Sequence, residues 1–449
     1  MVDPGGTLVA EATPPGRGGV RVVRVSGPLA ASILDRHFRP AGSRSPREVP
    51  RRLCAGDVRL PDGRLLDRAL AVFFPAPRSF TGEDTTEFHV HGSGGVVEAV
   101  VSFCLEAGCR RAAPGEFSWR AFLHGKMGLL EAEALEGLAA STAREGAIRA
   151  AAVLGGALRQ RLESLREGLL DLQARWEAQV DFPEDAGEGD PAEEAALLER
   201  LLAEAEALDR SGQALPRLRE GSAVALAGPP NSGKSSLFNA LLNRERALVT
   251  PHPGTTRDVL EETLEVDGFP LVLRDTAGLR EGPGEVEALG MEAGLRAAAT
   301  ADAVLFLYDG ARGWDGEAER AFGMLPLPPR WIAANKCDLF AGPVPPGHIR
   351  LSARTGEGLP ALAAELGRWL REQVPSGEAG PVSLRQAEAA GRLRRALEVA
   401  RRDLSEGAGI EVAADGLARA RRAVEEALFG EGSPEELYER IFSRFCIGK

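Results

Sequence analysis

The chain has 449 residues, 44% of them hydrophobic, which is enough for about two to four domains with buried cores. A formal net charge of −12 argues against a protein that coats nucleic acid non-specifically, and no apolar run approaches the roughly 18 residues of a membrane span. The five scattered cysteines include no CxxC pair, and the N-terminal sequence has no secretory pattern, so we expect a cytoplasmic protein without a disulfide framework.

Lysine is rare in this sequence. Of 54 basic residues only four are lysines, namely Lys126, Lys234, Lys336 and Lys449. Arginine and lysine differ in shape and hydration, so the lysines that persist in an arginine-rich chain are candidates for sites that need a compact ammonium group. The alternative is that a few lysines persist by chance.

The residue pattern that predicts secondary structure changes along the chain. Residues 1–118 are predicted to form an N-terminal α/β domain, since β-branched runs such as GGVRVVRVS alternate with turn signals. Long amphipathic helices are predicted over 120–180 and 191–215, separated by the acidic stretch 181–191, which we expect to be a solvated loop.

Strand and helix patterns then alternate from residue 222 to about 375, as in a doubly wound α/β fold, and VDGFP is predicted to be a hairpin with Asp-Gly at its turn. Helical texture returns after the Pro/Gly-rich stretch 373–382 and continues to 429. The predicted architecture is a discontinuous helical domain (119–215 and 377–449) split by an inserted α/β domain (216–376).

The segment GPPNSGKSS (228–236) follows a predicted strand and precedes a predicted helix, so it is a complete P-loop in its required context. Backbone N–H groups of such a loop cradle phosphates at a helix N-terminus. Lys234 is expected to contact the β- and γ-phosphates, and Ser235 to bind Mg²⁺. This motif by itself indicates only a nucleoside triphosphatase.

Three further motifs indicate guanine. DTAG (275–278) places Asp275 near Mg²⁺ and Gly278 near the γ-phosphate, and NKCD (335–338) provides Asp338 as acceptor for two guanine donors. SAR (352–354) completes the base pocket, and Thr256 in PGTTRD (253–258) is expected to bind Mg²⁺. Together they predict a Ras-like GTPase domain.

The residue after DTAG is Leu279, which can neither donate nor accept a hydrogen bond, whereas many small GTPases have Gln there. An arginine finger, typically worth about 10³–10⁵ in rate, or another cation must supply the missing charge. The carbonyl of the Asn231 side chain could hold a monovalent cation against the phosphates, or Asn231 could cap the loop; the residue alone leaves both open.

Together with these motifs, PPGRGG (14–19), VRVSGP (23–28), FTGED (80–84), PGEFSWRAF (114–122), DTAGLR (275–280) and the terminal FCIGK make the chain resemble, from end to end, the tRNA-modification GTPase family MnmE (TrmE). The resemblance implies a homodimer joined through N-terminal folate-binding-like domains. It also implies a flavoprotein partner, MnmG (GidA), with which GTP hydrolysis leads to an aminomethyl or carboxymethylaminomethyl group on C5 of the wobble uridine of tRNAs.

The resemblance also implies roles for single residues. Asn231, Thr255 and the backbone carbonyls of Thr250 and His252 would bind potassium. Glu287 would activate water, against the alternative of an ordinary solvated glutamate, and Arg280 is a further catalytic candidate. The expected GTP-binding set is Asn231, Ser232, Gly233, Lys234, Ser235, Ser236, Thr250, Pro251, His252, Pro253, Gly254, Thr255, Thr256, Asp275, Thr276, Ala277, Gly278, Asn335, Lys336, Asp338, Ser352, Ala353 and Arg354.

In this family the C-terminal end reaches a folate pocket. The resemblance implies that Arg24, Glu83, Lys126 and Lys449 bind a 5-formyl-tetrahydrofolate-type one-carbon donor, with Glu83 accepting from the amino and N3–H groups of the pterin. Cys446 either takes part in chemistry or is a small buried apolar residue.

The sequence departs from the family pattern at HVHGSGG (89–95), which leaves the role of His91 open, and at His124 and Gly128. Two other functions compete with the family reading. One is a regulatory or ribosome-assembly GTPase with RNA-binding outer domains, and the other is a folate-binding protein with a vestigial GTPase domain.

Overall fold

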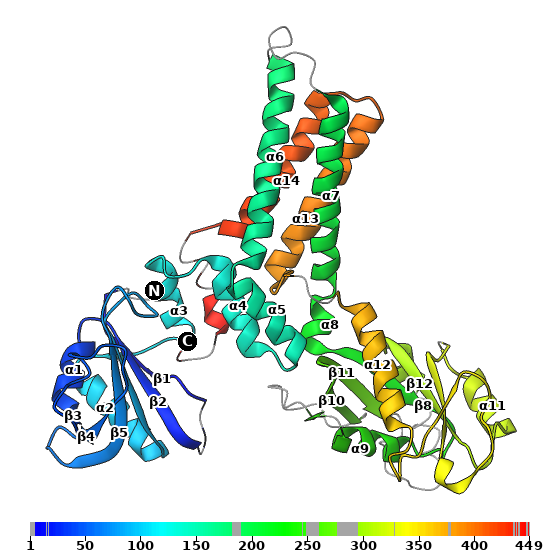
Figure 1. Cartoon of the computed structure of the whole chain (residues 1–449), viewed down its shortest axis with the longest axis horizontal. Coiled ribbons are helices and arrows are strands. Elements are labelled where there is room, and N and C mark those ends of the chain that lie inside the picture. The colour runs from blue at the N-terminus through cyan, green and yellow to red at the C-terminus, as the bar shows by residue number, and fades with distance from the viewer. Residues whose placement is uncertain are drawn as a thin grey trace. The chain divides into compact units, whose positions relative to one another are not determined.

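The computed structural model describes residues 5–14, 16, 18–181, 190–244, 246–247, 260–275, 295–326, 328–375, 379–433, 436, 438, 441–445 and 448. The chain divides into two compact units, residues 1–136 with 428–449, and residues 137–427. Figure 1 labels many of the elements of both. Among the helices in these ranges, none is both long and apolar enough to cross a membrane.

The first unit is built on a seven-stranded sheet of order β3-β4-β5-β6-β2-β1-β7, in which only β1 and β7 pair in parallel. Its strands are β1 Leu8–Glu11, β2 Gly18–Ser26, β3 Phe38–Pro40, β4 Cys54–Arg59, β5 Leu65–Phe74, β6 Thr85–Gly92 and β7 Arg110–Arg111. The helices α1 Ala30–His37 and α2 Gly94–Glu106 cover one face. The predicted mixture of helix and strand in this region is therefore confirmed.

Successive side chains of β2 point alternately to the two faces of the sheet, one of which is the hydrophobic core. Val23 and Val25 point into the core under α1 and α2, so Arg24, between them, points to the opposite face. On that opposite face Leu8 and Ala10 of β1 pack against Phe117 of α3, which spans Glu116–Leu123. The helix α3 thus lies against the face from which Arg24 projects.

The last residues of the chain pack against α3 in the same unit. Tyr438, Phe442 and Phe445 form an aromatic cluster with Trp119, together with Leu129 and Ala132 of α4 (Leu129–Ala140). The short helix η2 spans Phe442–Arg444, and the hydroxyl of Tyr438 donates to the carbonyl of Pro114 at 2.9 Å. Packing of this kind explains why the sequence keeps large aromatic residues so near its end.

The second unit contains the long helices. They are α5 Arg144–Leu154, α6 Ala157–Asp181, α7 Pro191–Gln213, α13 Leu384–Ser405 and α14 Ile410–Phe429, and α7 and α13 lie side by side (Figure 1). The segments before and after the α/β part of the chain are therefore in contact. The predicted loop 181–191 lies almost entirely outside the described residues.

The helices predicted over 120–180 are present, and they are the four helices α3, α4, α5 and α6. Gly125 at φ 63° and Gly156 at φ 90° adopt left-handed backbone conformations just beyond the ends of α3 and α5, which they help to terminate.

The α/β part of this unit has a seven-stranded sheet of order β14-β13-β12-β8-β11-β10-β9. The five strands from β14 to β11 are parallel, and β10 and β9 are antiparallel additions. The strands are β8 Ser222–Ala227, β9 Arg246–Ala247, β10 Leu260–Val266, β11 Phe269–Asp275, β12 Ala303–Asp309, β13 Trp331–Asn335 and β14 His348–Arg350.

Helices cover both faces of this sheet. In β8, Val224 and Leu226 face the cluster that includes α8 (Leu215–Glu220), α9 (Lys234–Arg244) and α12 (Leu359–Gln373). Ala223 and Ala225 face the cluster that includes α11 (Gly316–Gly323). The central strand is buried on both faces, as the predicted doubly wound type requires.

Candidate functional sites

The P-loop lies between β8 and α9, as predicted. Gly228 has a φ of 144°, and a Cβ there would lie 1.9 Å from the carbonyl oxygen of Leu307, so only glycine fits. The ammonium of Lys234 donates to the carbonyls of Gly228 and Pro229, each at 3.0 Å. Burial lowers the pKa of Lys234, while the charge of Asp275 acts in the opposite direction. A bound phosphate would compensate this buried charge further.

Asn335 at the end of β13 joins the P-loop to the predicted base pocket. Its Nδ2 donates to the carbonyl of Ser232 at 2.8 Å, and its Oδ1 accepts from the backbone N–H of Ala353 at 2.9 Å. A Cβ on Gly233 would lie 2.2 Å from this Nδ2, so a glycine is needed for the contact. The structure thus brings the GPPNSGKSS, NKCD and SAR motifs together.

The rest of the base pocket is also preorganised. The hydroxyl of Ser352 donates to Oδ1 of Asp338 at 2.6 Å. Lys336 adopts a left-handed conformation, φ 66°, and its ammonium pairs with Asp309 Oδ2 at 2.7 Å. Asp309 ends β12, beside β13, and sequence reasoning did not select it, although its place at a strand end next to NKCD was a usable signal.

Oxygen ligands suited to Mg²⁺ lie at the same edge of the sheet. Asp275 ends β11 and is 1% exposed, and its register partner on β8 is Leu226, just before the P-loop. Ser235 is exposed in the first turn of α9. A carboxylate and a hydroxyl fit a hard divalent cation.

Several predicted site residues lie outside the described residues. They are Thr250, Pro251, His252, Pro253, Gly254, Thr255, Thr256, Thr276, Ala277, Gly278, Arg280, Glu287, Cys446 and Lys449.

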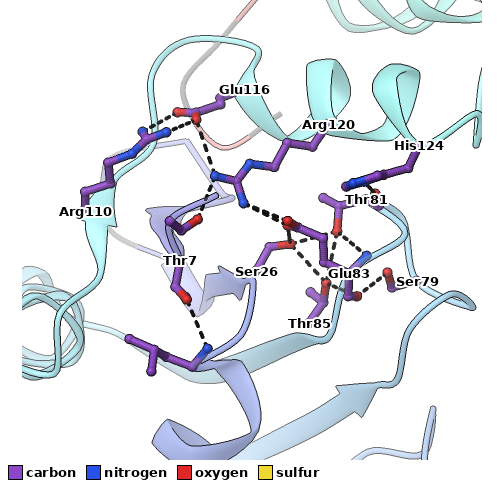
Figure 2. A network of polar contacts seen from close by, with 12 residues as sticks. Thr7, Ser26, Ser79, Thr81, Glu83, Thr85, Arg110, Glu116, Arg120 and His124 are labelled. Carbon is purple, nitrogen blue, oxygen red and sulfur yellow. Dashed lines mark hydrogen bonds and ion pairs between the residues drawn. The ribbon is translucent and has the colours of Figure 1, made fainter. Parts of the chain in front are cut away.

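A second polar site lies in the first unit, between the sheet and α3 (Figure 2). One nitrogen of Arg120, Nη1, donates to both oxygens of Glu83 at 2.9 Å, and the other, Nη2, donates to the carbonyl of Gly6 at 2.7 Å. The hydroxyl of Ser26 donates to Glu83 Oε2 at 2.8 Å. Arg120 is 1% exposed, so this ion pair is largely removed from water.

Arg24 lies on the same face and has its own counterion. Its Nε donates to Glu87 Oε1 at 2.8 Å across the β2–β6 pair, and its guanidinium lies 5.5 Å from the ring centres of Phe80 and Phe117. Burial would raise the pKa of Glu87, but a hydrogen bond from His89 and the charge of Arg24 outweigh it and hold that pKa below its usual value.

The end of the chain reaches Arg24. Nη1 of Arg24 donates to the carbonyl of Gly448 at 3.4 Å. Gly448 has a φ of 95°, and a Cβ there would lie 2.2 Å from the carbonyl oxygen of Glu11, so the tail passes close to the end of β1. Lys126, an exposed residue, lies three positions beyond the end of α3.

Two of the residues at which the chain departs from the family pattern, His124 and His91, have structural partners. Nδ1 of His124 lies 2.6 Å from the carbonyl oxygen of Thr81, in the same loop as Glu83. His91 pairs with Asp67, with 2.7 Å between Nδ1 and Oδ1, and its side chain is exposed. Sequence reasoning missed Glu87, Glu116 and Arg120 as parts of the second site, although two of them lie in the motif PGEFSWRAF.

The doubly wound sheet, the P-loop lysine and the preorganised base pocket define a P-loop protein of the GTPase class. Residues 7–126 match the family model described as GTP-binding protein TrmE N-terminus, and residues 129–446 match the MnmE helical domain. The tRNA modification GTPase MnmE of Synechococcus sp. (strain RCC307) is 41% identical over 447 residues, covering 98% of this chain and 97% of that protein.

The protein of the same name from Thermus thermophilus is 42% identical over 452 residues, covering 98% of this chain and 99% of that protein. This chain therefore belongs to the tRNA modification GTPase MnmE family, which confirms the resemblance seen in its motifs. A crystal structure of Era with MgGDPNP and ribosomal RNA is 26% identical, covers 40% of this chain and 67% of the Era chain, and has a TM-score of 0.26.

Proposed function

We propose that this chain is a potassium-activated GTPase that acts with an MnmG-type flavoprotein to add an aminomethyl or carboxymethylaminomethyl group to C5 of the wobble uridine of tRNAs. Membership in the MnmE family supports this function, because relatives that match almost the whole chain bear the name tRNA modification GTPase. The alternative of a ribosome-assembly GTPase loses support, because the segments on both sides of the GTPase part match MnmE models.

In the GTPase step, Lys234 binds the β- and γ-phosphates from a P-loop whose carbonyls already hold its ammonium. Asp338, oriented by Ser352, accepts the guanine donors. Ser235 and Asp275, with Thr256, would hold Mg²⁺, which would neutralise phosphate charge. Glu287 orients the attacking water. Among the described residues, Lys234, Ser235 and Asp275 have types and positions that suit charge stabilisation of a transferred phosphoryl group.

Potassium, when bound, supplies positive charge beside the phosphates, which Leu279 cannot provide. Asn231 is exposed at a φ of 58° in the P-loop, and no hydrogen bond joins its side chain to the described residues around it. This favours cation binding over loop capping. We propose Asn231, Thr250, His252 and Thr255 as the ligands.

The test compares GTP hydrolysis in KCl and NaCl at equal ionic strength. We expect hydrolysis to be faster in KCl by on the order of ten-fold or more, since an arginine finger in the same role gives about 10³–10⁵. The Asn231→Ala variant should hydrolyse GTP at the same slow rate in both salts. Equal rates for the unmodified protein in the two salts would overturn the potassium proposal.

We further propose that Arg24, Glu83, Lys126 and Lys449 bind a 5-formyl-tetrahydrofolate-type donor. The contact of Arg24 with Gly448, next to Lys449, supports the placement of the chain end at this site. The proposed assembly is a homodimer through the N-terminal domains, in the cytoplasm, where tRNA is modified. The proposed domain boundaries remain residues 118, 215 and 376.

A further inference from the structure

The Glu83 carboxylate is held mainly by one buried arginine. Arg120 contacts both of its oxygens, and Ser26 contacts Oε2, so about three of the roughly four acceptor positions of the carboxylate are occupied. The Glu83 side chain is 16% exposed and that of Arg120 is 1% exposed. Arg120 therefore approaches from the interior and leaves the exposed part of Glu83 open to solvent.

Arg120 is itself fixed from two further directions (Figure 2). Its Nη2 donates to the carbonyl of Gly6 and lies 3.8 Å from Oε1 of Glu116. Glu116 accepts from Arg110 Nη1 at 2.8 Å and from the backbone N–H of Ala113 at 2.8 Å. Two glutamates and two arginines balance in charge, and the planar guanidinium of Arg120 links them in one orientation.

Ser26 is a less constrained partner of Glu83 than Arg120. Its Oγ lies 2.7 Å from Oγ1 of Thr81, and either hydroxyl can be the donor of that bond. The Ser26 hydroxyl can therefore turn to Thr81 and release an acceptor position on Glu83. Arg120 has no such freedom, because its nitrogens are spread over Glu83, Gly6 and Glu116.

We propose that Arg120 is a positioning residue of the one-carbon-donor site, holding the Glu83 carboxylate in the one orientation that accepts the 2-amino and ring N–H donors of a pterin-type ligand together. This inference rests on the proposed function, which assigns Glu83 to the ligand. Arg120 touches Glu83 and not the ligand, so its effect is on discrimination between ligands that differ in their donors.

The test uses the full chain and two probes, 5-formyl-tetrahydrofolate and an analogue in which a methyl group replaces the pterin 2-amino group. Calorimetric titration gives the ratio of the two dissociation constants. We expect the unmodified protein to prefer the amino-bearing probe by about ten-fold or more, the range of a hydrogen bond to a charged group. Arg120→Met should bring this ratio to within about two-fold of one.

Because Arg120→Met removes a buried charge and could prevent folding, Arg120→Lys is the second variant. It keeps the charge but has one nitrogen in place of a planar fork, so the ratio should fall at least about three-fold while thermal unfolding stays cooperative. Arg111→Met is the matched control. It removes the exposed Arg111–Glu98 ion pair in the same unit and should leave the ratio unchanged.

Glu83→Gln distinguishes the positioning role of Arg120 from the existence of the folate site. If this variant loses the discrimination and Arg120→Lys keeps it at the unmodified value, the folate site stands and the role of Arg120 is refuted. If Glu83→Gln binds both probes as the unmodified protein does, the proposed folate site itself is wrong, and the inference falls with it.

Discussion

At the scale of single residues, the rarity of lysine raises the question of whether arginine can replace Lys234. The ammonium of Lys234 fits between two carbonyl oxygens at 3.0 Å, in a loop where burial lowers its pKa. A guanidinium is wider and planar and cannot take this position without displacing the loop. Lys234→Arg should therefore lower GTP affinity by about 10–100-fold, measured by titration with a fluorescent GTP analogue.

The control for this prediction is Arg244→Lys, the opposite exchange at the far end of the same helix, where we expect no change in affinity. An affinity of Lys234→Arg within about three-fold of the unmodified protein would show that the loop needs only a positive charge.

The lowered pKa of Glu87 predicts a dependence of stability on pH. A carboxyl whose pKa is depressed on folding stabilises the fold above its usual value of 4.5 and loses this contribution as the pH falls through the lower folded-state value. Glu87→Gln should cost about 1–2 kcal/mol in the free energy of unfolding at pH 7, because Arg24 loses its charged partner. Urea titration should show the difference shrinking below pH 4.5.

Exposed Glu98, whose partner Arg111 is also exposed, is the comparison: Glu98→Gln should change stability by no more than about 0.5 kcal/mol at either pH. A Glu87→Gln difference that stayed constant down to pH 3 would mean that packing, and not charge, accounts for it.

The motifs that the structure brings together around the P-loop could be recognised in the sequence because they have fixed spacing and lie where strands end. The partners of the second site could not. Glu87 meets Arg24 from 63 positions away, and Arg120 meets Glu83 from 37 positions away. Only the pairing of β2 with β6 and the packing of α3 create these contacts, so no local pattern indicated them.

At the scale of elements, the β10–β11 hairpin confirms the predicted Asp-Gly turn and reveals what holds it. Asp267 and Gly268 have φ values of 52° and 90°, as a two-residue hairpin turn with two positive φ angles requires. The carbonyl of Gly268 accepts from the backbone N–H of Glu145 at 2.9 Å, and Arg144 donates to the carbonyl of Asp267 at 3.3 Å. The turn between two sheet strands is thus bound to the start of α5.

Gly268→Ala should therefore weaken this unit. Alanine is strained at a φ of 90°, and its Cβ would lie 2.7 Å from Nη2 of Arg144. We expect a loss of about 1–3 kcal/mol, or roughly 2–8 °C in melting temperature, measured by calorimetry. Gly323→Ala, at a glycine with open space around its Cβ position, should change little, and equal melting temperatures for the two variants would contradict the argument.

At the scale of the whole molecule, the periodicity of the sequence indicated helices from 377 to 429, and only the family resemblance indicated that the C-terminal end reaches the N-terminal domain. The structure groups residues 428–449 with residues 1–136. Local periodicity carries no such information, because the contacts are made by aromatic rings across more than 300 positions, as in the Tyr438–Pro114 hydrogen bond. Gly115 also packs closely against the C-terminal segment, because a Cβ there would lie 2.1 Å from the carbonyl oxygen of Phe442.

Because the C-terminal segment and the P-loop belong to different units, we expect its removal to affect tRNA modification but not GTP hydrolysis. Deleting residues 446–449 removes Gly448, the acceptor for Arg24, while the P-loop lies in the other unit. GTP hydrolysis should remain within about two-fold, since no residue of the described nucleotide site is lost, and modification of tRNA in an assay with the flavoprotein, GTP and potassium should be abolished.

Gly448→Ala provides the matched variant of full length. Its Cβ would lie 2.2 Å from the backbone carbonyl oxygen of Glu11, so the tail must move away although every other residue is retained. We expect it to lose tRNA modification as the truncated protein does, with GTP hydrolysis unchanged. Modification at the unmodified rate by both variants would remove the tail from the reaction, and loss of GTP hydrolysis in either would show that the tail acts on the nucleotide site.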